Sequence, residues 1–269
     1  IYAINVFVDK YLVEARIPDY RSLPIFGIFL SLPVALGLWV SSGFELIGLR
    51  DSILVITAGV LTIWAFSLYL EALAKEETSS LIILIQLIPV IVLTLSFFIF
   101  GESLTHKQLL GFGLLLLSTI LVSLKKEKRS FRFSRALVFI LMADILWSIP
   151  YILIKSASAS ISFNSLIMYE SLGVSLGGLM LFLFIPVIRS AFTKTIKGIR
   201  KTDLGIILFN EGLYLGAKII TYLAVTLGPV AVISILGSTQ IFFGILLGVV
   251  LTMLVPKVFK ENLSKDGLI

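Results

Sequence analysis

The chain contains no cysteine, a single histidine and few charged residues. Without thiols it has neither a disulfide framework nor a thiolate metal site, and one histidine cannot build a metal centre by itself. The phosphate-binding pattern G-x-x-x-x-G-K-[ST] is also missing, which argues against a nucleotide-driven pump. Charged residues make up 14% of the 269 residues, whereas a soluble domain has about a quarter. We therefore expect no metal site, no cofactor and no catalytic residues, and we do not predict an enzyme.

The chain is rich in long apolar segments. Hydrophobic residues make up 58% of it, 20 residues are phenylalanine, and the mean hydropathy is +1.07. The apolar stretches run for roughly 17 to 25 residues, which is enough for a helix to cross a hydrocarbon layer about 30 Å thick. The strands of a membrane barrel are shorter and alternate in polarity. The sequence therefore predicts an all-α membrane protein with several transmembrane helices.

Nine apolar segments divide the chain. The first ends near Leu12 and looks like a truncated helix, and a tenth helix would be largely missing after Glu261. The other segments are expected at residues 24–41, 52–73, 79–100, 107–124, 136–157, 163–187, 204–226 and 229–254. We predict about ten transmembrane helices in total. They would form a first five-helix repeat at residues 1–125, a basic linker at 126–134 and an incomplete second repeat at 135–269.

One short signature occurs twice, at Gly101–Lys107 and at Lys260–Asp266, each time after a long apolar run. The first copy follows the fourth predicted span and the second copy follows the ninth, so five spans separate them. An odd number of spans inverts the second copy relative to the first. Two inverted repeats are typical of secondary transporters, whose halves move around a site near the middle of the bilayer.

Basic residues gather in two loops on one face of the predicted bundle. Residues 125–135 hold six cations and one acid, and residues 189–203 hold five cations and one acid. Because cytoplasmic loops carry an excess of Lys and Arg, this charge places the face in the cytoplasm. Basic runs beside membrane spans are ordinary, so no nucleic-acid partner is expected.

Several short motifs occur in the same order in both halves. The first half has Tyr69–Leu73, Pro89, Gly101–Thr105 and Gly111, and the second half has Tyr222–Val225, Gln240 near the position of Gln86, and Glu261–Ser264. In order and spacing these motifs resemble the EamA repeat of the drug/metabolite transporter superfamily. The resemblance implies ten helices with both termini in the cytoplasm, which would put the basic linker on the other side. The loop charges imply the opposite, so both orientations stay open.

Polar side chains within the predicted spans are the candidates for a binding site, because they are costly in a bilayer unless they face a cavity or a partner. Asn210, Tyr214 and Lys218 recur at i, i+4 and i+8 and so share one face of a helix. We predict a substrate site made of Trp64, Gln86, Asp144, Trp147, Tyr151, Glu170, Asn210, Glu211, Tyr214 and Lys218. Both signs of charge and several aromatic rings suit a zwitterion or an organic cation. In the alternative interpretation, the charged members neutralise one another as structural ion pairs.

Other charged residues are expected to have structural roles. Lys10 and Lys155 lie near the ends of spans, where their amines can reach the lipid headgroups. Glu71 is expected at a solvated helix end. Glu102 and Glu261 are expected to cap or brace the turn into the next span.

Glycines four residues apart are concentrated in the second half. Such small-residue pairs let two helices approach closely. The pairs are Gly173 with Gly177, Gly212 with Gly216 and Gly244 with Gly248. We expect them to serve packing within the bundle.

The resemblance implies export or exchange of small metabolites such as amino acids, amines, sugars or nucleotide sugars. We predict a secondary transporter in the cell membrane, an exporter of small polar metabolites such as amino acids or amines, which works by alternating access. Its partners would be a small-molecule substrate and the lipid bilayer. Proton coupling through Glu211 or Asp144 and uncoupled diffusion both fit, and the oligomeric state stays open. The main alternative is a flippase for a lipid-linked substrate; a membrane-embedded enzyme or a scaffold are further ones.

Overall fold

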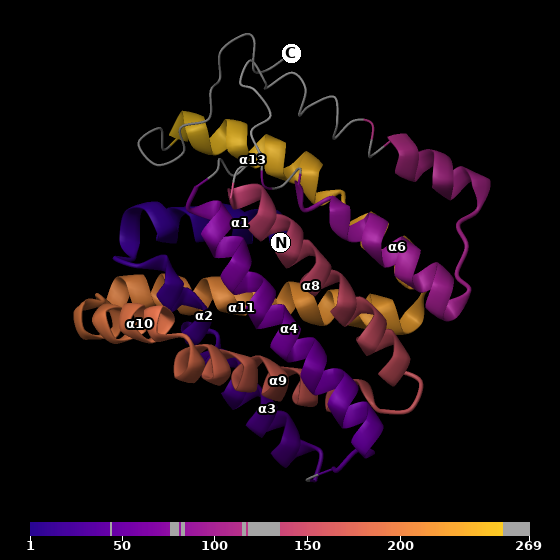
Figure 1. The fold of residues 1–269 in the computed structure, drawn as a ribbon, viewed down its shortest axis with the longest axis horizontal. Coiled ribbons are helices and arrows are strands. Elements are labelled where there is room, and N and C mark those ends of the chain that lie inside the picture. Colours follow the sequence, from indigo (N-terminus) through magenta and orange to yellow (C-terminus); the bar gives the residue numbers. More distant parts are fainter. Residues whose placement is uncertain (44, 76–80, 82–83, 115–116, 118–134, 255–269) are drawn as a thin grey trace.

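The computed structural model describes residues 1–43, 45–75, 81, 84–114, 117 and 135–254, and these residues form helices and no strands (Figure 1). The helices are α1 (Tyr2–Tyr11), α2 (Leu23–Phe26), α3 (Ile28–Ser41), α4 (Leu49–Leu73), α6 (Leu87–Phe100), α8 (Arg135–Ala157), α9 (Phe163–Phe184), α10 (Pro186–Gly198), α11 (Lys201–Leu227), α12 (Val230–Gly237) and α13 (Gln240–Leu254). A π turn at Leu12–Arg16 and a 3-10 turn at Tyr20–Ser22 join α1 to α2. The predicted all-α class is confirmed for the described residues.

Six helical stretches of the described residues are long and apolar enough to cross a membrane. They are Tyr20–Ser41, Leu49–Leu73, Arg135–Ala157, Phe163–Phe184, Lys201–Leu227 and Val230–Leu251. Each coincides with a predicted span, which confirms six of the nine as apolar helices of sufficient length. The apolar helix Leu87–Phe100 is shorter, and α1 has 10 residues. The ten-helix count stays a prediction, and both the basic linker and the second signature lie outside the described residues.

The predicted span at 163–187 ends early, and the basic loop after it is largely helical. Helix α9 stops at Phe184, and Pro186 starts α10 at its first position, where the missing N–H of proline costs nothing. Ile188 and Ala191 of α10 are buried, whereas Arg189 and Lys194 are exposed. An amphipathic basic helix of this kind suits the membrane interface.

Helix α4 lies at the centre of the bundle, between α8 and α9 (Figure 1). Its contact with α9 is backbone to backbone: a Cβ on Gly59 would overlap the carbonyl oxygen of Glu170, and a Cβ on Gly173 would overlap that of Ile56. A Cβ on Gly177 would lie 2.6 Å from Ile63 Cγ2. The prediction of close packing is thus confirmed for Gly173 and Gly177.

The second glycine pair of that prediction behaves differently. A Cβ on Gly212 or Gly216 would have no described atom within 4 Å, apart from the chain neighbours and backbone of its own helix. The expectation of close packing is therefore wrong for this pair. The physical reason is that these glycines face open space, so their small size brings no second helix closer.

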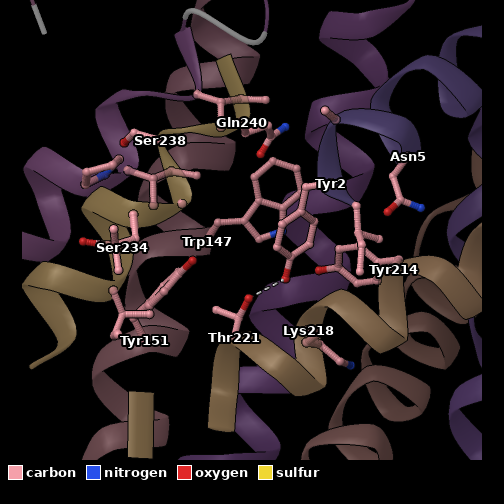
Figure 2. A pocket seen from close by; sticks show the side chains of 18 of the residues that line it. Tyr2, Asn5, Trp147, Tyr151, Tyr214, Lys218, Thr221, Ser234, Ser238 and Gln240 are labelled. Carbon is pink, nitrogen blue, oxygen red and sulfur yellow. Dashed lines mark hydrogen bonds between the residues drawn. The ribbon is translucent and has the colours of Figure 1, made fainter. Parts of the chain in front are cut away.

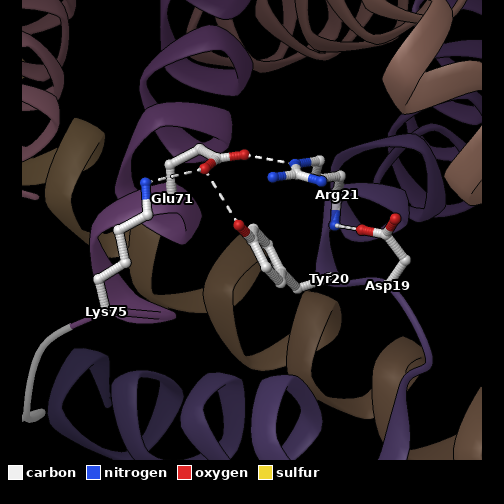
Figure 3. A network of polar contacts seen from close by, with 5 residues as sticks. All are labelled: Asp19, Tyr20, Arg21, Glu71 and Lys75. Atoms are coloured by element: carbon white, nitrogen blue, oxygen red, sulfur yellow. Dashed lines mark hydrogen bonds and ion pairs between the residues drawn. The ribbon is translucent and has the colours of Figure 1, made fainter. Parts of the chain in front are cut away.

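Glu71, predicted at a solvated helix end, instead binds the segment that precedes α2 (Figure 3). Arg21 Nε donates to Glu71 Oε1 at 2.6 Å, and the hydroxyl of Tyr20 donates to Oε2 at 3.0 Å. Lys75 Nζ lies 3.4 Å from the same Oε2, and the Glu71 side chain is 20% exposed. Glu71 does lie at the end of α4, as predicted, but its carboxylate is only partly solvated because partners distant in sequence cover it.

Lys10 and Lys155 also differ from prediction, since both turn into the protein and bind the end of another helix. Lys10 Nζ donates to the carbonyl of Leu73 at 2.8 Å, at the end of α4. Lys155 Nζ donates to the carbonyls of Val225 and Gly228, at 3.0 and 2.9 Å, at the end of α11. The last carbonyls of a helix have no partner within it, so a lysine amine is a favourable cap.

Candidate functional site

A cavity of about 440 Å³ lies among α1, α4, α8, α11, α12 and α13, so both halves of the chain form its walls. Its lining is mostly apolar, with aromatic, hydroxyl and amide groups between the apolar ones. Figure 2 shows Tyr2, Trp147, Tyr151 and Tyr214 directed into it, with the hydroxyl of Tyr2 3.2 Å from that of Thr221. The volume and the few polar groups are typical of a small-molecule site.

Two breaks in helices face this cavity. Helix α6 begins after a turn at Ile85 and Gln86, and a turn at Ser238 and Thr239 separates α12 from α13. Both turns are closed by tight i to i+3 bonds, from Ile88 N to the carbonyl of Ile85 and from Thr239 N to that of Leu236, each at 3.1 Å. Discontinuous helices at a central cavity are a feature of transporter binding sites, where they place polar groups in the bilayer interior.

The structure brings seven of the ten predicted site residues to the cavity or to a smaller one of about 40 Å³ beside it. Gln86, Trp147, Tyr151, Tyr214 and Lys218 line the large cavity, and Asn210 and Glu211 line the small one. Tyr214 and Lys218 line both. The polar stripe predicted on the span at 204–226 therefore faces these cavities.

Glu170 lines neither cavity, because it is the buried partner of Lys218. Lys218 Nζ donates to Glu170 Oε2 at 2.7 Å, and their side chains are 4% and 0% exposed. The hydroxyl of Tyr222 donates to the other carboxylate oxygen at 3.4 Å. The geometry of Lys218 and Glu170 therefore agrees with the alternative interpretation, in which charged residues neutralise one another as structural ion pairs. Lys218 nevertheless also lines the cavity.

Trp64 and Asp144 also line neither cavity. Trp64 Nε1 donates to the carbonyl of Gly177 at 3.2 Å and so ties α4 to α9. Asp144 of α8 is fully buried, and no described group hydrogen-bonds either of its carboxylate oxygens. The structure thus places these two residues in helix contacts rather than at the cavity wall.

Sequence reasoning missed a polar cluster on α1. Asn5 Nδ2 donates to the backbone oxygen and to Oδ1 of Asn210, both at 2.9 Å. Asn210 Nδ2 in turn donates to Asp9 Oδ1 at 2.7 Å. Asn5 and Asp9 line both cavities and are nearly fully buried. Their i, i+4 spacing in an apolar run is the same pattern that singled out Asn210 and Lys218, and it was available in the sequence.

The sequence of the first half matches a known family. Residues 1–124 match the model of the EamA-like transporter family, which is part of the drug/metabolite transporter superfamily. Over these residues, a little under half of the chain, the protein is similar to the EamA-like transporter family. This match confirms the predicted resemblance, and with the six apolar helices it indicates an integral membrane protein. The second EamA-like repeat at 135–269 stays a prediction.

A solved crystal structure resembles this chain over nearly its whole length. The similarity covers 98% of this chain and 90% of the other, with a TM-score of 0.57 and 17% sequence identity. At that identity the likeness shows a shared fold and nothing about substrate. No curated protein matches the chain.

The chemistry that this cavity offers is recognition of a solute by charge, stacking and hydrogen bonds. Asp9 is the only acidic residue, and Lys218 the only lysine or arginine, among the described residues that line the large cavity. In the described part of the chain, no three His, Cys, Asp or Glu side chains come together as a metal site. The groups present can bind, orient and release a small solute.

Proposed function

We propose that the protein is a secondary transporter of the cell membrane that exports small polar metabolites such as amino acids or amines. The observation that carries the proposal is the cavity of about 440 Å³ between the two halves, faced by two helix breaks. Because walls from both halves surround one cavity, a relative movement of the halves would open it to one side of the membrane and then to the other. The EamA-like match of residues 1–124 agrees with this class of function.

The proposed mechanism uses two inverted repeats, residues 1–125 and 135–269, with the linker 126–134 between them. Two correspondences support it. Lys10 of α1 caps the end of α4, and Lys155 of α8 caps the end of α11. The next helix in each half is broken, at Gln86 in the first and at Ser238 in the second. The same local construction recurs in the same order, as expected of two copies of one unit.

One contact between the halves depends on the first signature. Glu102 was predicted to cap or brace the turn into its own next helix, but Thr105 and Gln108 cap that turn instead. Gln108 Oε1 accepts from the backbone N–H of Thr105 at 2.9 Å. The two carboxylate oxygens of Glu102 instead accept from Val230 N and Ala231 N, each at 3.0 Å. These donors are N–H groups at the start of α12 that have no partner within that helix, so Glu102 caps a helix of the other half.

Glu102→Ala is expected to loosen this contact. Removal of a helix cap costs about 1 kcal/mol, which corresponds to a melting temperature lower by roughly 2–4 °C in a chain of this size. Thermal unfolding of the purified protein in detergent measures the effect. Glu102→Gln is the control, because its amide oxygen still accepts one bond and should lose less. A Glu102→Ala protein that melts with the wild type would contradict this assignment of Glu102.

Transport in proteoliposomes tests the proposed function. We expect labelled amino acids or amines to cross the membrane only when the protein is present. If Glu211 couples transport to protons, flux should follow an imposed pH gradient and Glu211→Gln should abolish that dependence. Glu14 is an exposed acid on the π turn, so Glu14→Gln is the matched control and should keep the dependence on the pH gradient.

Flux that does not depend on the gradient and survives Glu211→Gln would identify a facilitator. No flux of any such solute would contradict the proposal and favour a flippase.

A further inference from the structure

The two charged residues that line the large cavity differ in how far their charge is already compensated. Lys218 is bound to Glu170 at 2.7 Å, and 4% of its side chain is exposed. Figure 2 shows its nitrogen directed away from Trp147 and Tyr151. A carboxylate of a solute would have to displace Glu170 to reach this amine, and separating a buried ion pair is costly.

Asp9 has no comparable partner. The groups that interact with it are neutral or acidic: the Asn210 amide donates to Oδ1 at 2.7 Å, and the Tyr69 hydroxyl and the carboxyl of Glu211 lie nearby. No lysine or arginine of the described residues forms an ion pair with it; its neighbour Lys10 lies 2.9 Å from Glu14 and donates to Leu73. Asp9 lines both cavities, so a solute in the large one can approach it. Among the described residues, Asp9 thus has no cationic partner, whereas Lys218 has an anionic one.

Aromatic rings surround the rest of the cavity. Tyr2 and Tyr214 meet edge to face with their ring centres 5.9 Å apart, and Tyr69 and Trp147 are tilted at 5.4 Å. All four line the cavity. The faces of such rings attract cations, and their area suits an apolar or aromatic body.

We propose that the substrate of this cavity is an organic cation, an amine with an apolar or aromatic body, whose ammonium group pairs with Asp9 while Lys218 stays paired with Glu170. The inference rests on the proposed transport function and narrows its substrate class. It assigns the role of counter-ion to Asp9, with Asn210 and Asn5 as positioning residues that hold its carboxylate through a chain of hydrogen bonds.

Three probes with the same ring and different charge test this inference on the full chain in proteoliposomes. Tyramine is a cation, tyrosine is a zwitterion and 3-(4-hydroxyphenyl)propionate is an anion. We expect tyramine flux to exceed tyrosine flux by about tenfold, because the carboxylate of Asp9 repels the carboxylate of tyrosine. For the same reason we expect no flux of the anion. Tyrosine flux equal to or above tyramine flux would overturn the inference and leave the transport function intact. Absence of flux for all three probes would also overturn the inference, and the transport function would be contradicted as well only if no other amino acid or amine crosses the same membranes.

Variants separate the role of Asp9 from a general effect on folding. Asp9→Asn should lower tyramine flux by about 30-fold, as expected when one partner of a desolvated charge pair is removed. Asp9→Glu should restore most of the flux, and the exposed control Glu14→Gln should keep it. Each protein is first shown to be monodisperse by size-exclusion chromatography. Asp9→Asn protein that is monodisperse and transports tyramine like the wild type would overturn the inference.

A second variant tests the inference without touching Asp9. Glu170→Gln removes the negative partner of Lys218 and leaves an uncompensated cation at the cavity. The expected result is a change of preference: tyramine flux falls, and flux of tyrosine or the propionate rises relative to it. An unchanged order of the three probes in a monodisperse Glu170→Gln protein would contradict the assigned roles of the two charges.

Discussion

Lys218→Met should destabilise the protein by about 3 kcal/mol or more. The reason lies in the buried pair: Lys218 and Glu170 are 2.7 Å apart with side chains 4% and 0% exposed, so loss of the lysine leaves a carboxylate without a counter-ion in the bilayer interior. The melting temperature of the detergent-purified protein measures this loss of stability. It is obtained by size-exclusion chromatography of samples heated to a series of temperatures.

The control for this prediction is the double variant Lys218→Met with Glu170→Gln. Once the carboxylate is also replaced, no uncompensated charge remains, so much of the lost stability should return. The two single variants, the double variant and the wild type form a double-mutant cycle. Its coupling energy measures the interaction between Lys218 and Glu170. A Lys218→Met protein as stable as the wild type, or a double variant less stable than either single one, would contradict the geometry of the pair.

Gly173→Ala should prevent α4 and α9 from packing as they do. Its new methyl group would overlap the carbonyl oxygen of Ile56, a backbone atom that cannot rotate away. Overpacking of this kind costs about 3 kcal/mol or more when no side chain can yield. We expect a low yield of monodisperse protein and a markedly lower melting temperature. Gly59→Ala, which overlaps the carbonyl of Glu170 from the other side of the same contact, should behave alike.

Gly216→Ala is the matched control for this packing prediction. A methyl group there meets no atom of another element within 4 Å, and alanine is the better helix former by about 1 kcal/mol. The variant should therefore be as stable as the wild type or slightly more so. Equal stability of the Gly173→Ala and Gly216→Ala proteins would show that the α4–α9 contact is not as close as described.

The helices could be predicted from the sequence because a bilayer imposes one simple rule. A chain in lipid satisfies its backbone within helices, so long apolar runs become helices wherever they occur. This rule found α4, α8, α9 and α11 to within a few residues. It could not find α10, whose apolar residues occur only on one face and whose start depends on Pro186. The breaks before α6 and α13 were missed for a different reason, since one or two polar residues within a long apolar run do not by themselves predict that a helix ends.

The candidate site could be predicted where the relevant residues share one helix. The i, i+4, i+8 spacing of Asn210, Tyr214 and Lys218 placed them together, and the structure puts them beside the cavities. The same criterion, applied to α1, would have found Asn5 and Asp9. They were missed because the first segment was treated as a truncated helix rather than as part of the interior.

Contacts between distant parts of the chain could not be predicted. Glu102 was expected to act on the next turn, but its partners at Val230 and Ala231 are more than a hundred residues away. The hydrogen-bond partners of Glu170 and Trp64 also lie on other helices. Glu170 binds Lys218, and Trp64 binds the carbonyl of Gly177. Periodicity shows which face of a helix is polar, but it does not show which helix lies opposite.

The central claim is that the cavity between the halves is where the solute binds during transport, and thiol protection tests it most directly. The chain has no cysteine, so Ser238→Cys introduces a single thiol at the break that lines the cavity, and Ser160→Cys introduces one in an exposed turn. We predict that saturating tyramine or tyrosine slows the reaction of the thiol at position 238 with a small methanethiosulfonate reagent and leaves the one at position 160 unaffected. If solute does not change the labelling rate at position 238, the account is contradicted.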